Sequence, residues 1–80
     1  MHALILIKPL ARDAESVAER LAATKHGDSI VLLDTGEILI WLTFENTEGL
    51  TSMLKQIREI PGVQSTESKL VLSRMRSEQP

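Results

Sequence analysis

The sequence predicts a small α+β domain whose elements follow the order β-α-β-β-α-β. Four short runs rich in Ile, Leu and Val are interrupted by two segments whose apolar residues recur at helical spacing. The two middle runs are separated by only a few residues of turn chemistry, which indicates a β-hairpin. With 80 residues there is room for one hydrophobic core, so the elements are expected to form a single domain.

The first half of the chain predicts a strand followed by a helix. The run Ala3–Lys8 is short, apolar and closed by Pro9, as expected of a buried strand. Asp13 can accept hydrogen bonds from the free N–H groups of a first helical turn. The helix is expected to end near His26-Gly27, where glycine can adopt the left-handed conformation. Its apolar side is formed by Val17, Ala18, Leu21 and Ala22.

The middle of the chain predicts a hairpin. Ile30–Leu33 is a second strand, and Ile38–Phe44 is a third. The link between them, Asp34 to Glu37, contains Gly36, which can supply the positive φ of a tight turn. We therefore expect the second and third strands to pair directly.

The second helix and the last strand complete the pattern. The segment from Asn46 to Glu48 offers capping side chains, and the helix must stop before Pro61 because proline disfavours helical geometry in its predecessor. The run Lys69–Ser73 is the predicted last strand, so the domain spans 1–74 and 75–80 is a flexible tail. The apolar side of this helix is formed by Leu50, Met53, Leu54, Ile57 and Ile60.

This order of elements predicts a ferredoxin-like plait. Right-handed crossovers place both helices on one face of a four-stranded antiparallel sheet, with the first and third strands at its centre. In a monomer the other face should be polar. The first and third strands do not alternate, however, so Ile5, Ile7, Leu39 and Trp41 are predicted to form an apolar patch on the second face. Such a patch usually marks an interface, and we expect a homodimer or higher homo-oligomer.

Composition argues against several classes of function. Nine Lys and Arg against eleven Asp and Glu give a net charge of −2 without a basic face, which disfavours direct nucleic-acid binding. No apolar run is long enough to cross a membrane, and the N-terminus has no signal-peptide pattern, so a cytoplasmic protein is expected. There are no cysteines and only two histidines, far apart in sequence, so no metal site or cofactor is predicted.

The sequence offers no catalytic constellation. His26 and Asp28 could be drawn as an acid–base pair, but no nucleophile, base and orienting group are recognisable together. The segment after the first strand lacks the glycine-rich cradle that a plait acylphosphatase needs for its anion. We therefore expect a protein that is not an enzyme.

Several motifs resemble the effector domain, or RAM domain, of Lrp/AsnC transcription regulators. They are Thr35-Gly36-Glu37, similar to the family's TGEYD hairpin, the Ile60–Val63 segment, similar to its IPGV helix exit, and Thr66-Glu67-Ser68, similar to its T-x-T strand start. With the opening strand and first helix, the resemblance covers nearly the whole chain. It implies a plait that dimerises through its sheet and binds a small molecule, typically an amino acid, between subunits.

Carried over position by position, this resemblance implies that Gly36, Glu37, Thr66 and Ser68 contact the ligand. Leu39 stands where the family has the hairpin aspartate, which removes the partner expected for a ligand ammonium. A helix-turn-helix half does not precede Met1, so the resemblance implies a stand-alone effector domain. Any role in transcription regulation would then be exerted through a partner protein.

A second resemblance is to the NapD-type chaperones, which bind twin-arginine signal peptides during maturation of periplasmic nitrate reductase. The segment Gly36–Glu45 is similar to their G-x-I-V-V-x-x-E strand, and Pro61–Val63 to their PGV helix exit. The Tyr-His pair that usually follows in that family is absent here. In this alternative the apolar sheet face receives a signal-peptide helix instead of a second copy of the domain.

Overall fold

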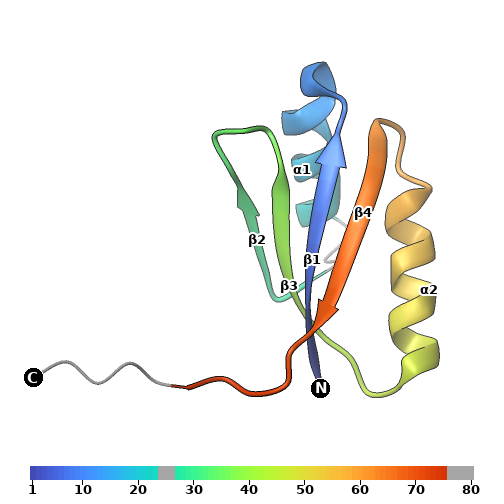
Figure 1. Cartoon of the computed structure of the whole chain (residues 1–80). Coiled ribbons are helices and arrows are strands. Elements are labelled where there is room, and N and C mark those ends of the chain that lie inside the picture. The colour runs from blue at the N-terminus through green and yellow to red at the C-terminus, as the bar shows by residue number, and fades with distance from the viewer. Residues whose placement is uncertain (24–26, 76–80) are drawn as a thin grey trace, which may run out of the picture.

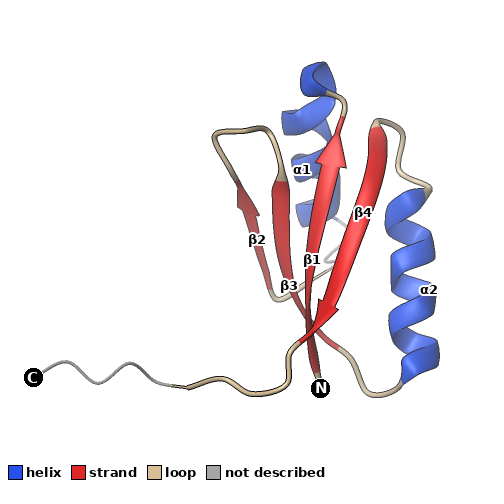
Figure 2. Ribbon diagram, viewed as in Figure 1, coloured by secondary structure: helices blue, strands red, loops and turns tan. Residues whose placement is uncertain are grey.

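The structure, a computed structural model, describes residues 1–23 and 27–75. Figures 1 and 2 show a sheet with two α-helices, and a short 3-10 turn, Ala11–Asp13, leads into the first of them. The elements are β1 (His2–Pro9), α1 (Ala14–Ala23), β2 (Ser29–Leu32), β3 (Ile38–Thr43), α2 (Thr47–Arg58) and β4 (Val63–Leu70).

The sheet has the strand order β2-β3-β1-β4, and each neighbouring pair is antiparallel. The two central strands are therefore β1 and β3, while β2 and β4 form the edges. Residues of both α1 and α2 belong to one core with the central strands, so both helices lie on the same side of the sheet. The predicted ferredoxin-like α+β fold is confirmed. We call the covered side the helix face and the other side the open face.

Strand register decides which side chains reach the helices. On β1 and β3, Ile5 pairs with Ile40 and Ile7 with Ile38, and all four side chains are fully buried. Because directly opposed residues project to the same side of a sheet, these isoleucines form one layer. The helices close this layer with Val17, Leu21 and Ile57.

The hairpin and the second helix form where the sequence predicts them. Gly36 has φ +89°, and the turn is closed by hydrogen bonds from Leu33 N–H to the Glu37 carbonyl and from Gly36 N–H to the Leu33 carbonyl, both at N···O distances of 2.8–2.9 Å. At the start of α2, the Asn46 side chain accepts a hydrogen bond from Gly49 N–H at 2.8 Å. That contact satisfies one of the free donors of the first helical turn.

The predicted position of the last strand is wrong. The strand runs over Val63–Leu70, so it begins directly after Gly62, and residues 71–75 lie outside any strand. Most of its side chains are exposed, because β4 is an edge strand held to β1 through its backbone. An edge strand in this position needs few apolar residues, so a search for an apolar run places it too late in the chain.

Two predictions fall partly on residues that the structure does not describe. The predicted end of the first helix at His26 lies in 24–26, and most of the predicted tail 75–80 lies in 76–80, both outside the described residues. Gly27, which follows the first gap, lies against β3, where an added Cβ would collide with the Ile40 side chain and meet the Trp41 carbonyl oxygen at 3.2 Å. Glycine is needed here for close approach of two backbones.

The assignment of faces predicts unequal effects for two adjacent residues of β1. Ile5→Ala should lower the free energy of unfolding by about 2–5 kcal/mol, because it leaves a cavity in the core. Leu6→Ala should cost only about 1 kcal/mol, because the Leu6 side chain is partly exposed on the open face. Urea denaturation of the two variants measures the difference. A larger loss for Leu6→Ala would mean that the two faces are exchanged.

Candidate functional site

The open face carries an apolar surface at the centre of the sheet. Leu4 of β1 pairs with Trp41 of β3, and Leu6 pairs with Leu39, which in turn pairs with Val31 of β2. The Val31 side chain is 44% exposed, and the other four are half-buried although the helices lie on the opposite side. We call this surface the open-face cluster: Leu4, Leu6, Val31, Leu39 and Trp41.

The predicted membership of this surface is partly wrong. Ile5 and Ile7 were expected beside Leu39 and Trp41, but the register places both isoleucines on the helix face with zero exposure. The physical reason is that β1 is apolar on both faces, so alternation along this strand alone does not show which set faces the helices. Leu39 and Trp41 do lie on the open face, and their partners there are Leu4 and Leu6.

The sequence did contain a signal for the correct grouping. Alternate residues of a strand project to the same face of the sheet. His2 and Lys8 therefore lie on the same side of β1 as Leu4 and Leu6, and Thr43 lies on the same side of β3 as Leu39 and Trp41. Polar residues at strand ends belong on the solvent side, so they mark the set that the helices leave uncovered.

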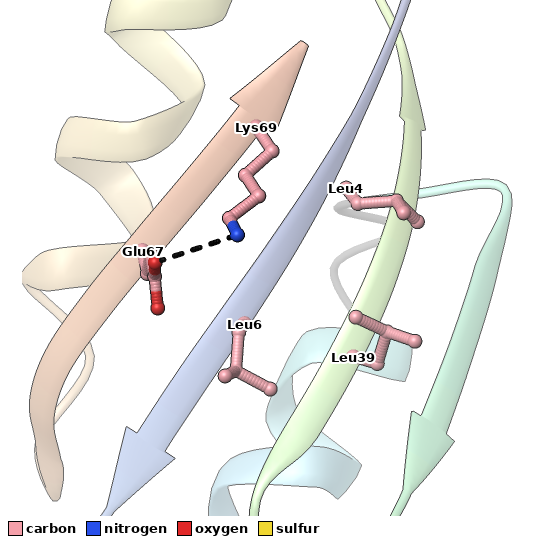
Figure 3. Close-up of a pocket in the computed structure, with 5 residues that line it drawn as sticks. All are labelled: Leu4, Leu6, Leu39, Glu67 and Lys69. Carbon is pink, nitrogen blue, oxygen red and sulfur yellow. Dashed lines mark ion pairs between the residues drawn. The ribbon is translucent and has the colours of Figure 1, made fainter. Parts of the chain in front are cut away.

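Two shallow hollows lie on this face and share Leu4 and Leu39. One has a volume of about 210 Å³ and is lined by these residues with Leu6, Glu67 and Lys69. Figure 3 shows the three leucines beside the Glu67–Lys69 ion pair of β4, whose charged atoms are 3.9 Å apart. The other hollow, of about 370 Å³, is lined by Leu4, Leu39, Ser29, Val31, Trp41 and Arg74. Together they form an apolar groove with a charged rim along β4.

Trp41 lies where several polar groups meet. Its ring is tilted against the His2 ring at a centroid distance of 5.0 Å, and the Arg74 guanidinium lies 5.2 Å from the ring centroid. Thr43, on the same face, donates a hydrogen bond to the Asp28 carboxylate and is 3.1 Å from His2 Nδ1. The tryptophan therefore has an apolar side toward the cluster and a polar side toward the end of the sheet.

The ligand residues implied by the RAM-domain resemblance lie on two separate elements of the described chain. Gly36 and Glu37 lie in the β2–β3 hairpin, where Thr35 Oγ1 donates to Glu37 Oε1 at 3.0 Å. Thr66 and Ser68 lie on β4, separated from β3 by β1. Thr66 accepts a hydrogen bond from Arg58 Nε at 3.1 Å, so it faces α2. Their assignment as ligand contacts stays a prediction.

Other kinds of site find little support in the described residues. His26 lies outside them, and its proposed partner Asp28 is engaged by Thr43. In the ranges 1–23 and 27–75, no group of three or more His, Asp or Glu side chains could hold a metal ion. No described helix is long and apolar enough to span a membrane.

Comparison with known proteins finds likeness at the level of structure. No protein-family description and no curated protein matches the sequence. The crystal structure of TTHA0845 from Thermus thermophilus superposes with a TM-score of 0.82 at 19% identity, covering 95% of this chain and 98% of that chain. The solution structure of the E. coli Tat proofreading chaperone protein NapD superposes with a TM-score of 0.74 at 13% identity, covering 100% of this chain and 85% of that chain. At these identities the comparisons show a shared fold.

The missing hairpin aspartate of the RAM-domain pattern leads to a prediction about amino acids. A ligand present at 100 times its Kd would add about 2.7 kcal/mol of stability, which is easily seen as a higher melting temperature. Because Leu39 stands where the family has the aspartate that would pair with a ligand ammonium, we expect the melting temperature to be unchanged across the standard amino acids. A rise that disappears in Thr66→Ala would instead establish the RAM-type site.

Proposed function

We propose that this protein is a small chaperone, not an enzyme, that binds a twin-arginine signal peptide on the open face of its sheet. The observation that carries the proposal is the open-face cluster, an apolar groove left uncovered at the centre of the sheet. The structural likeness to the Tat proofreading chaperone NapD supports the choice of ligand.

The groove suits the apolar part of such a peptide. A signal peptide contains an apolar stretch, and an amphipathic helix can lay its apolar side into a hydrophobic groove. Leu4, Leu6 and Leu39 offer side chains from two adjacent strands without a charge between them. Burying each large apolar side chain fully would contribute about 1.5–3 kcal/mol, so a few such contacts can give useful affinity.

Charge is compatible with this ligand. The chain carries a net charge of −2, and Glu67 lies on the rim of the groove. The described charged residues that line the two hollows, Glu67, Lys69 and Arg74, are of mixed sign, and Glu67 is paired with Lys69, so long-range charge neither strongly attracts nor strongly repels the basic residues of a twin-arginine peptide. A strongly basic open face would have argued against such a ligand.

Leu39→Glu should weaken binding of a synthetic peptide that carries an Arg-Arg pair before a leucine-rich stretch. The new carboxylate would be desolvated between Leu6 and Val31 when the peptide binds, so we expect Kd to rise by at least about tenfold. The fluorescence of Trp41, the single tryptophan, reports binding in the wild-type protein. The same measurement on Leu39→Glu gives the change.

Gln56→Glu is the matched control, since it adds the same carboxylate on an exposed position of α2. It should bind the peptide like the wild-type protein. Equal Kd values for Leu39→Glu and Gln56→Glu would exclude the open face as the binding surface, and no saturable change in the wild-type protein would exclude the function for this peptide.

Oligomeric state separates this proposal from the RAM-type alternative, in which the open face meets a second copy and the protein serves as an effector-binding and oligomerisation module. A stable interface between proteins buries about 1,200–2,000 Å² in total. We expect native mass spectrometry at micromolar concentration to show a monomer that binds one peptide. A dimer that Leu39→Glu dissociates would favour the self-association alternative.

A further inference from the structure

The chain itself places an arginine on the open face. After β4, Val71 N–H donates to the His2 carbonyl at 2.9 Å, and the chain then runs past the lower end of the sheet (Figure 1). On this path Leu72 is fully exposed and Met75 is 88% exposed. Arg74, between them, lies with its guanidinium 5.2 Å from the Trp41 ring centroid.

This arrangement is the reverse of what hydrophobic burial alone would give. A segment that settled on an apolar surface for its own burial would turn Leu72 or Met75 toward it. Here the apolar residues face water, and the cation meets the aromatic ring. The attraction between a guanidinium and the electron-rich face of tryptophan explains why Arg74, and not Leu72 or Met75, lies against Trp41.

We propose that Trp41 is the arginine-binding position of the open face, and that Arg74 fills it as an internal occupant until an arginine of the bound peptide replaces it. The claim that a peptide arginine binds Trp41 rests on the proposed function. The claim that Arg74 occupies this position concerns the free protein and does not depend on any peptide. A guanidinium fits because it is planar, always charged and weakly hydrated, so it stacks on an aromatic ring more readily than an ammonium.

The surroundings of Trp41 explain how displacement would expose the groove. Arg74 lines the larger hollow together with Leu4, Leu39 and Trp41, so moving its side chain away uncovers apolar surface next to the ring. His2 contacts the same ring, and Asp28 donates its N–H to the Trp41 carbonyl at 2.9 Å. Neither contact involves Arg74.

The first test needs no ligand. Acrylamide quenching of Trp41 fluorescence should increase in Arg74→Ala, because the side chain that lies over the ring is removed. Quenching in Arg74→Lys should be intermediate between that of the wild-type protein and that of Arg74→Ala. Arg12→Ala is the control: it removes the same charge from a side chain that is 84% exposed in the 3-10 turn. Equal quenching in the wild-type protein and Arg74→Ala would overturn the inference, whatever any peptide does.

The second test measures competition with the Arg-Arg peptide by calorimetry. Losing the internal occupant should tighten binding by about 2- to 5-fold in Arg74→Ala, the factor expected for an exposed cation–π contact, with Arg12→Ala unchanged. A Lys-Lys version of the peptide should bind more weakly than the Arg-Arg version to the wild-type protein, and Trp41→Leu should abolish that preference. Equal binding of the two peptides, or a preference that survives in Trp41→Leu, would contradict the arginine-binding position.

The two tests distinguish failure of the proposed chaperone function from failure of the inference about Arg74. A quenching difference without binding of either peptide would refute the proposed function and the displacement step, while establishing the Arg74–Trp41 contact. Peptide binding with equal affinity in the wild-type protein and Arg74→Ala would retain the chaperone proposal and refute Arg74 as a competing occupant.

Discussion

The register between β1 and β3 is the constraint on which the rest of the structure depends. Pairing Ile5 with Ile40 directs the isoleucines of both central strands toward the helices, and it directs Leu4 and Trp41 the other way. A shift of one residue in either strand would exchange its two sets of side chains. The buried layer of Ile5, Ile7, Ile38 and Ile40 therefore fixes the composition of the open face as well as the core.

This constraint explains why the sheet has an apolar surface at its centre. Both central strands are apolar on their two sides, but the two helices can cover only one side. The edge strand β4 compensates with polar residues, and Arg74 covers part of Trp41. What remains is a groove lined by leucines, and the proposed peptide binding rests on it. The proposed chaperone function and the internal occupant are two consequences of this one uncovered surface.

The sequence predicted the architecture better than the surface. The hairpin at Gly36 and the cap at Asn46 follow from local chemistry that neighbouring residues supply, and both were found where expected. Which residues share a face depends on pairing between distant strands, so Ile5 and Ile7 were assigned to the wrong side. The contact of Arg74 with Trp41 joins residues far apart in sequence, and no local pattern indicates it.

Methyl-resolved NMR during a titration with the Arg-Arg peptide tests the central claim most directly, because both faces of the central strands carry methyl groups that can be followed separately. The account predicts that the methyl signals of Leu4, Leu6 and Leu39 shift on binding, while those of Ile5 and Ile40 in the core remain nearly unchanged. Shifts confined to residues of α1 or α2, with the three leucines unaffected, would contradict it.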